Sequence, residues 1–362
     1  MGGSLMSEVI SIASRSGTYQ VLFTENILEI IKAYSNETIF IIDEKLQAPY
    51  RDIYSAIRNS GRCIIVNALE QNKTVNYCQQ LIKALVRLNV RKNYTLVAIG
   101  GGIVQDITGF IASMLFRGVR WQFIPTTLLA QADSCIGSKT SMNLDEYKNI
   151  LGGFYPPSKI YIDIQFLDTL PTKEIKSGIG EILHFYFIAN SPLLYEMINN
   201  YEELLLSRHH FKKFISESLS IKKELIEIDE YDQKERNIFN YGHTFGHAIE
   251  SISNYEVPHG QAVTIGMDIA NYISKSIYEL SINEFNMMHD ILIKNFPSYQ
   301  IPTDKIDDYF VALSKDKKNI GKNLGCILTD GIGSMWKAQI PLDGVLKSTI
   351  SEYFEYYDLF DK

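Results

Sequence analysis

Two histidines four residues apart, His243 and His247, stand in the stretch "FNYGHTFGHAIE" of this 362-residue chain. Four residues are slightly more than one helical turn, so both side chains would lie on the same face of a helix. The chain has only seven histidines. This spacing is compatible with a metal site, an acid–base pair or two histidines of the core.

Two further segments carry possible metal ligands. The stretch "GIGEILHFYFI" places Glu181 and His184 three residues apart on an otherwise apolar helix. A carboxylate there is costly to bury unless it is paired or bound to a metal, and the alternative is a glutamate on the helix surface. The stretch "HGQAV" places His259 at the start of another apolar helix. These residues could supply a zinc site of two histidines and one carboxylate, with one histidine to spare. The spacing is not HExxH, which disfavours a zincin protease.

A glycine cluster in "LVAIGGGIVQDITGF" (96–110) follows a predicted strand and precedes a helical pattern. Glycines at this place let backbone N–H groups approach a phosphate, and the start of the helix favours its negative charge. The spacing is not GxGxxG. The cluster therefore indicates either the pyrophosphate site of a nucleotide or an ordinary tight turn.

The polar segment 125–157 follows the next predicted strand and carries Asp133, Lys139, Lys148 and Asn149. Two lysines on a loop beside a nucleotide could hold a phosphorylated substrate. The alternative is that both lysines are simply solvated.

The elements that must position these residues differ between the two halves of the chain. Short apolar runs predict strands at 38–43, 63–69, 95–101, 121–127 and 159–164, and 79–90 has helical spacing. Alternating strands and helices imply a parallel sheet covered on both faces, with ligands beyond the carboxyl ends of the strands. The second half has helical patterns at 178–190, 194–206, 210–228, 239–253, 262–279 and 283–294. We predict an α/β domain of residues 1–167 and an all-α domain of residues 168–362.

Composition narrows the class of protein. The net charge of −7 argues against a nucleic-acid-binding surface, and no apolar run approaches the length of a membrane span. The four cysteines are scattered without a CxxC motif, and the first residues have no signal-peptide pattern. We therefore expect a cytoplasmic protein without disulfides.

Taken together, the motifs resemble those of 3-dehydroquinate synthase and the related sugar phosphate cyclases. The glycine cluster, "PTTLLAQ", the "GE" on a helix, "NYGHTFGHA", "HGQAV" and "KDKK" occur in the family's order, over about residues 38–335. The resemblance implies a Rossmann-like NAD-binding domain, a helical metal- and substrate-binding domain, a site in the cleft between them and a homodimer. It also implies the shikimate pathway of aromatic amino acid biosynthesis.

The resemblance assigns residues by position. The metal, usually zinc and sometimes cobalt, would be held by Glu181, His243 and His259, while His247 would face the substrate phosphate. Residues implied for NAD are Asp43, Glu70, Lys73, Gly101, Gly102, Ile103, Asp106, Thr126, Thr127, Lys148, Phe166, Thr169 and Leu170. Residues implied for the sugar phosphate are Asp133, Lys139, Asn149, His184, Lys222, Arg236, Asn240, His247 and Lys317, with Arg117 from the second subunit.

Several motifs depart from those of 3-dehydroquinate synthase. His184 stands where the family typically has lysine, Gln105 replaces a glycine, and "GSKTS", "YKN" and "HGQAV" replace "GGKTG", "GKN" and "HGEAV". Lys222 and Arg236 match the pair that grips the substrate carboxylate, which favours a 3-deoxy-heptulosonate phosphate. The alternatives are an amino-dehydroquinate synthase, a cyclase of sedoheptulose 7-phosphate, a metal-dependent alcohol dehydrogenase of the glycerol dehydrogenase kind, and a relative without activity.

Overall fold

The computed structural model describes residues 8–145, 147–316, 318–357 and 360–361. The chain forms two compact units. Unit 1 contains the residues up to Leu170 together with Lys222–Tyr231, and unit 2 contains Pro171–Ile221 and the residues from Asp232 onward. The sequence predicts one division, between residues 167 and 168. The segment 222–231 belongs to unit 1 because Lys222 donates a hydrogen bond to Asp133 and Glu230 accepts one from Ser138.

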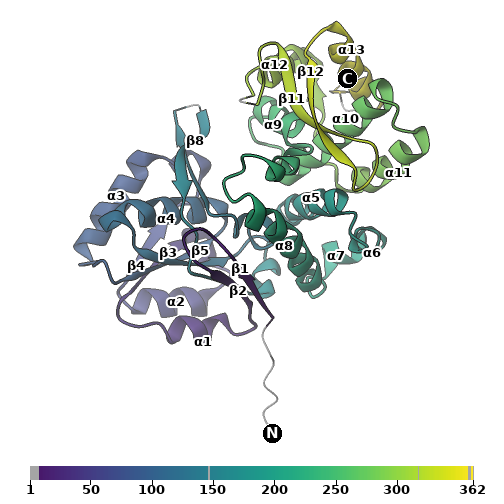
Figure 1. Cartoon of the computed structure of the whole chain (residues 1–362). Coiled ribbons are helices and arrows are strands. Elements are labelled where there is room, and N and C mark those ends of the chain that lie inside the picture. Colours follow the sequence, from purple (N-terminus) through teal and green to yellow (C-terminus); the bar gives the residue numbers. More distant parts are fainter. Residues whose placement is uncertain (1–7, 146, 317, 358–359, 362) are drawn as a thin grey trace. The chain divides into compact units, whose positions relative to one another are not determined.

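Unit 1 is built on a seven-stranded sheet (Figure 1). Its order is β1 (Val9–Ile12), β2 (Tyr19–Phe23), β9 (Lys159–Ile162), β6 (Arg120–Pro125), β5 (Thr95–Gly100), β3 (Thr38–Asp43) and β4 (Cys63–Val66). Only β1 is antiparallel to its neighbour. The five strands predicted from the sequence are neighbours in this sheet and make up its parallel part together with β2, which was not predicted; they confirm the predicted fold class.

Helices cover both faces of the sheet. Figure 1 shows α1 (Ile27–Lys32) and α2 (Arg51–Asn59) on one face, with α3 (Val75–Arg87) and α4 (Gly102–Met114) on the other. On the first face, Phe40 and Ile42 of β3 pack in one cluster with Ile53 and Ile57 of α2. Successive strand residues point to opposite faces, so a strand covered on both sides is apolar throughout.

The predicted polar loop 125–157 contains a hairpin of β7 (Lys139–Leu144) and β8 (Tyr147–Phe154). Asn143 donates to Glu70 and Ser141 donates to Asp106, both in distant parts of the chain. These partners are set by tertiary structure, which explains why no local pattern predicts the hairpin.

Unit 2 is mainly helical. Its helices are α5 (Thr172–Ala189), α6 (Leu193–Asn199), α7 (Tyr201–Leu206), α9 (His243–Ile252), α10 (His259–Ile277), α11 (Ile282–Leu292), α12 (Ile306–Ser314) and α13 (Gly344–Tyr356), and α8 (Phe211–Ile228) runs into unit 1. It also contains two strand pairs that the sequence analysis did not predict, β11 (Asn323–Thr329) with β12 (Met335–Pro341) and β10 (Ile301–Pro302) with β13 (Phe360–Asp361). The helix predicted at 194–206 is two helices, because Asn200 breaks the helical conformation and donates its side-chain N–H to the Glu196 carbonyl.

The central helix of unit 2 is α10, which packs against α5, α9, α11 and α13. Its Asp268 is fully buried, accepts a hydrogen bond from Tyr353 Oη at 2.8 Å and lies 2.7 Å from His289 Nδ1. A buried carboxylate is tolerated only with such partners, so this cluster fixes α10 relative to α11 and α13. No helix among the described residues is long and apolar enough to cross a membrane.

Candidate active site

Three helices of unit 2 bring together one carboxylate and two imidazoles. Glu181 lies within α5, and His243 and His259 are the first residues of α9 and α10. Glu181 Oε1 lies 3.7 Å from His243 Nε2 and 3.2 Å from His259 Nε2, and one donor atom from each residue lies within 4.8 Å of the others. Glu181 is only 2% exposed, whereas the side chains of His243 and His259 are 16% and 34% exposed, so the group joins a buried carboxylate to two partly accessible imidazoles.

The electrostatic surroundings favour the metal-binding protonation states of Glu181 and His243. Burial alone would raise the pKa of Glu181, but the imidazoles of His243, His259 and His184 outweigh it and hold that pKa well below its ordinary value. Burial lowers the pKa of His243 well below its usual range, although Glu181 opposes this shift. An ionised carboxylate and a neutral imidazole are the forms that bind a metal.

The donor set fits a divalent metal. No hydrogen bond of normal geometry to Glu181 Oε1 is present among the described residues, although this oxygen is completely buried. A buried carboxylate oxygen without a donor calls for another partner. One carboxylate oxygen and two imidazole nitrogens suit zinc or cobalt, and three protein ligands leave a position open for substrate.

Glycines allow the three helices to approach closely enough to assemble this group. A Cβ atom on Gly180 would lie 2.0 Å from the Gly260 carbonyl oxygen, and one on Gly266 would lie 2.0 Å from the Gly242 carbonyl oxygen. No side chain larger than hydrogen fits at such distances. The glycines beside Glu181, His243 and His259 in the sequence therefore have a packing role.

His247 lies outside the group formed by Glu181 and His243. Its donor atoms gather instead with those of Glu250 and His259, within 4.8 Å of one another. Glu250 Oε2 lies 3.0 Å from His259 Nδ1. Glu250 is not among the predicted site residues, although it is the last residue of the motif "FNYGHTFGHAIE".

His184, the departure from the family pattern, lies directly beside the ligand group. Its side chain is 1% exposed, and Nδ1 lies 3.8 Å from Glu181 Oε2. Its ring packs against His243, with 4.9 Å between centroids, and against Phe239 and Tyr241. A change of side chain here alters the surroundings of the predicted metal ligand.

The remaining predicted residues of unit 2 lie on two segments. Arg236 and Asn240 belong to the 3₁₀ helix Glu235–Asn240, and Arg236 is buried. Asn240 Oδ1 accepts a hydrogen bond from Lys318 Nζ at 3.3 Å. Lys317, which the sequence analysis assigned to substrate, lies outside the described residues. The run "KDKK" has adjacent lysines, so the sequence alone gave no reason to single out Lys318.

In unit 1, residues predicted for NAD gather at one edge of the sheet. Asp43 ends β3, Gly101 and Gly102 follow β5, and Thr126 and Thr127 follow β6. Glu70 lies in the short turn after β4. Because β6, β5, β3 and β4 are parallel neighbours, these residues share the edge where sheets of this kind bind ligands.

A second group of predicted residues forms one polar network beside that edge. Lys73 Nζ donates to Asp106 Oδ2 at 3.1 Å and to Asn149 Oδ1 at 2.6 Å, and Ser141 also donates to Asp106. Burial raises the pKa of Asp106, although Lys73 and Ser141 counteract it. Lys148 lies 3.8 Å from Glu70. The structure thus places Asn149, which the sequence analysis assigned to substrate, with residues assigned to NAD.

Asp133 and Lys222 form a close ion pair within unit 1. Asp133 lies in a π-helical turn (Ala130–Ser134), and Lys222 Nζ donates to Asp133 Oδ1 at 2.7 Å and to its carbonyl oxygen at 2.8 Å. Turns of this kind often occur at functional sites.

The other predicted residues of unit 1 are more dispersed. Thr169 Oγ1 donates to Tyr50 Oη at 2.9 Å, and Phe166 is buried against Tyr50. Ile103 and Leu170 are half-buried, and Lys139 is exposed. Arg117 is exposed in the left-handed backbone region, with φ of 62°.

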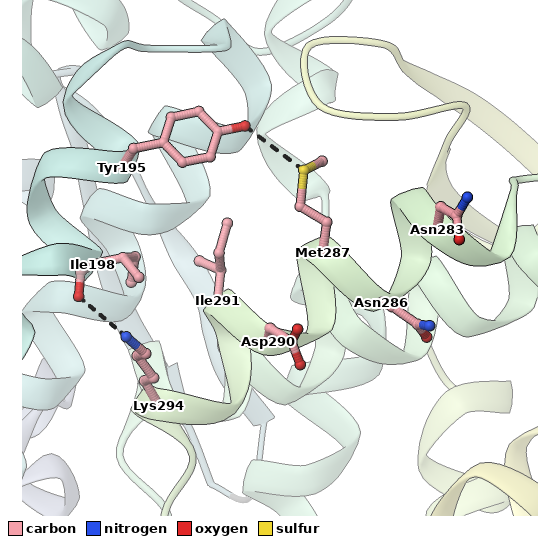
Figure 2. Close-up of a pocket in the computed structure, with 8 residues that line it drawn as sticks. All are labelled: Tyr195, Ile198, Asn283, Asn286, Met287, Asp290, Ile291 and Lys294. Atoms are coloured by element: carbon pink, nitrogen blue, oxygen red, sulfur yellow. Dashed lines mark hydrogen bonds between the residues drawn. The ribbon is translucent and has the colours of Figure 1, made fainter.

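Figure 2 shows a different hollow of unit 2, between α6 and α11. Two hydrogen bonds cross it, from Tyr195 Oη to Met287 Sδ and from Lys294 Nζ to the Ile198 carbonyl. Its described lining includes no residue predicted for metal, NAD or substrate, so we do not take it as the active site.

The chain thus combines a Rossmann-like unit with a helical unit that contains a Glu-His-His group of possible metal ligands. Family models described as "3-dehydroquinate synthase N-terminal" and "3-dehydroquinate synthase C-terminal" match residues 63–177 and 178–319. The chain is 34% identical over 344 residues to 3-dehydroquinate synthase of Clostridium tetani, covering 91% of both chains. The chain belongs to the 3-dehydroquinate synthase family, as the resemblance predicted.

Solved structures of related cyclases have the same fold. A 2-deoxy-scyllo-inosose synthase complexed with carbaglucose-6-phosphate, NAD⁺ and Co²⁺ has a TM-score of 0.85 and 26% identity, over 95% of this chain and all of that one. The 2-epi-5-epi-valiolone synthase of Streptomyces hygroscopicus, with NAD⁺ and Zn²⁺ bound, has a TM-score of 0.85 and 22% identity, over 96% and 99% of the two chains.

Proposed function

We propose that this chain is a cyclase of the 3-dehydroquinate synthase kind. It would convert a seven-carbon 3-deoxy-heptulosonate phosphate into a carbocycle with loss of phosphate, using NAD⁺ that is regenerated in each cycle. The observation that carries this proposal is the group of Glu181, His243 and His259, assembled from three helices at the positions of the family's motifs.

These three residues would hold zinc, or cobalt as in the 2-deoxy-scyllo-inosose synthase. A bound divalent metal polarises the substrate hydroxyl that loses its proton during oxidation. The strand-edge residues of unit 1 would bind NAD, with the backbone of Gly101 and Gly102 against the pyrophosphate at the start of α4. NAD⁺ would accept the hydride and return it later, so no net NADH would form.

Two cations support a substrate that carries a carboxylate. Lys222 and Arg236 are both buried, and Lys222 is already paired with Asp133. Both residues match the pair that grips the substrate carboxylate in 3-dehydroquinate synthase, and a heptulosonate carries a carboxylate whereas sedoheptulose 7-phosphate does not. The changed substrate-side motifs keep an amino analogue or another sugar phosphate as the second candidate, and the similarity to 2-deoxy-scyllo-inosose synthase favours that alternative.

The place of the protein in the cell follows from this proposal. Dehydroquinate formation belongs to the shikimate pathway of aromatic amino acid biosynthesis, which fits a cytoplasmic enzyme. We also propose a homodimer, because apolar side chains are exposed on the β7–β8 hairpin, at the last residue of α4 and just after it: Met114, Phe116, Tyr147, Ile150 and Leu151. Arg117 directly follows Phe116 in the sequence and would reach the partner's site.

Phosphate release tests the proposal. The protein, loaded with zinc and NAD⁺, is given 3-deoxy-arabino-heptulosonate 7-phosphate or sedoheptulose 7-phosphate in parallel assays. We expect phosphate from the first substrate without accumulation of NADH, and loss of this activity in Glu181→Gln. Phosphate from the second substrate alone would replace the proposal by its alternative, and stoichiometric NADH from a simple alcohol would indicate a dehydrogenase.

A further inference from the structure

The imidazole of His259 lies between two carboxylates of unit 2. Its Nε2 is 3.2 Å from Glu181 Oε1, and its Nδ1 is 3.0 Å from Glu250 Oε2. The Glu250 side chain is 14% exposed. Each ring nitrogen therefore has its own acidic neighbour, although only Glu181 belongs to the predicted ligand set.

We propose that Glu250 is a positioning residue that presents Nε2 of His259 to the metal. A neutral imidazole has one N–H donor and one lone pair, on different nitrogens. Donation of Nδ1–H to Glu250 leaves the lone pair on Nε2, the nitrogen that faces Glu181. A carboxylate bonded in this way fixes the tautomer and the ring orientation of a metal-bound histidine and increases its basicity. This inference rests on the metal role proposed for Glu181, His243 and His259.

The segment between α9 and α10 holds the pair in place. Tyr255 N–H donates to the Glu250 carbonyl at 2.9 Å, and Val257 N–H donates to Ser253 Oγ at 3.4 Å. At the start of α10, Gly260 N–H donates to Ser177 Oγ of α5 at 3.1 Å. Glu250 and His259 thus lie on either side of a short, internally bonded connection, which holds them close together.

The alternative interpretation of these residues is a second metal site. Donor atoms of His247, Glu250 and His259 lie within 4.8 Å of one another, as a second metal site would require. A metal there would need the lone pair on Nδ1 of His259, and the hydrogen bond to Glu250 would be lost. We favour the positioning role because the distance from Nδ1 to Oε2 is that of a hydrogen bond and because His247 is exposed.

Metal affinity tests the inference without any assay of activity. Metal-stripped wild type, Glu250→Ala and Glu250→Gln are titrated with Zn²⁺ against a chromophoric chelator, and Co²⁺ complexes are compared by visible absorption. We expect one metal per wild-type chain. Glu250→Ala should bind Zn²⁺ about 10–100-fold more weakly and change the Co²⁺ spectrum. Glu250→Gln should lie between, because its amide oxygen still accepts the hydrogen bond without the charge.

Glu256→Gln is the matched control, because Glu256 is exposed on the same connection, and it should bind metal as the wild type does. Wild-type affinity and spectrum in folded Glu250→Ala would overturn the positioning role. Two metals per wild-type chain, with one lost in Glu250→Ala, would establish the second site instead. Absence of metal binding by the wild type, or binding unchanged by Glu181→Gln, would contradict the proposed metal centre itself. Failure of the metal centre is thus distinguishable from failure of the positioning role of Glu250.

Discussion

Among the residues predicted for substrate, His184 is the one whose side chain departs from the family's motif. It is buried beside Glu181 and packs against His243, at a position where 3-dehydroquinate synthases typically carry lysine. An ammonium group has three donors and no acceptor, whereas a neutral imidazole has one donor and one acceptor. The hydrogen-bonding groups beside the proposed metal therefore differ from those of the family pattern.

We predict that His184→Lys keeps activity on 3-deoxy-arabino-heptulosonate 7-phosphate within about tenfold or improves it. The Glu181 carboxylate, 3.8 Å from the imidazole, can compensate a buried ammonium group. Steady-state phosphate release gives kcat/KM for wild type and variant. His210→Lys is the control, because His210 is about half exposed and pairs with Glu203 at the surface.

A loss of more than about a hundredfold, with metal still bound, would mean that His184 has a role of its own. In that case the imidazole of His184 itself would be required for the reaction.

At the scale of elements, the site depends on how closely α5, α9 and α10 approach. The backbone of Gly180 touches that of Gly260, and the backbone of Gly266 touches that of Gly242. The metal-ligand group is therefore a property of helix packing as much as of its three ligands.

We predict that Gly180→Ala destabilises unit 2 by about 1–3 kcal/mol or more and weakens metal binding, because the added methyl group would force α5 and α10 apart. Thermal unfolding and zinc stoichiometry measure both effects. Gly344→Ala is the control, since Gly344 is the first residue of α13 and has open space around its Cα. Equal melting temperatures and metal contents in the two variants would refute the packing role of Gly180.

Elements with strong local patterns are those that the sequence predicts well. The run "TIFIID" predicts β3 at its observed bounds, because its residues are buried on both faces of the sheet. In contrast, β7 contains polar residues whose partners, Glu70 and Asp106, lie more than 30 residues away in the chain. The pair β11–β12 was missed because it follows a charged run and includes Gly325, which weakens strand patterning.

The candidate site shows the same limit. Motifs predict Glu181, His243 and His259 as metal ligands, but spacing alone does not reveal that Glu250 Oε2 lies within hydrogen-bond distance of Nδ1 of His259. Nor does it reveal that Lys73 joins Asp106 to Asn149. These contacts connect segments whose separation in sequence carries no periodic signal, so only the folded chain shows them.

At the scale of the whole molecule, the exposed apolar hairpin predicts self-association. We predict that Ile150→Glu converts a dimer into a monomer, because a charge in an apolar interface must be desolvated without a partner. Ile150 is 58% exposed in the single chain. Sedimentation equilibrium gives the mass, and the variant should also lose activity if Arg117 serves the partner's site.

Val345→Glu provides the comparison, because Val345 is similarly exposed, at 65%, on α13 of the other unit. A monomeric wild type would contradict the proposed dimer. An Ile150→Glu variant that remains dimeric would show that the interface lies elsewhere.

Because the three ligands come from three separate helices, metal binding would also stabilise the folded chain. A metal bound by Glu181, His243 and His259 binds the folded chain and not the unfolded one, in which α5, α9 and α10 are apart. At a free metal concentration a hundred times the dissociation constant, this linkage adds about 2.7 kcal/mol to the free energy of unfolding. The supply of metal in the cell would then determine how much of this protein persists, as well as how much of it is active.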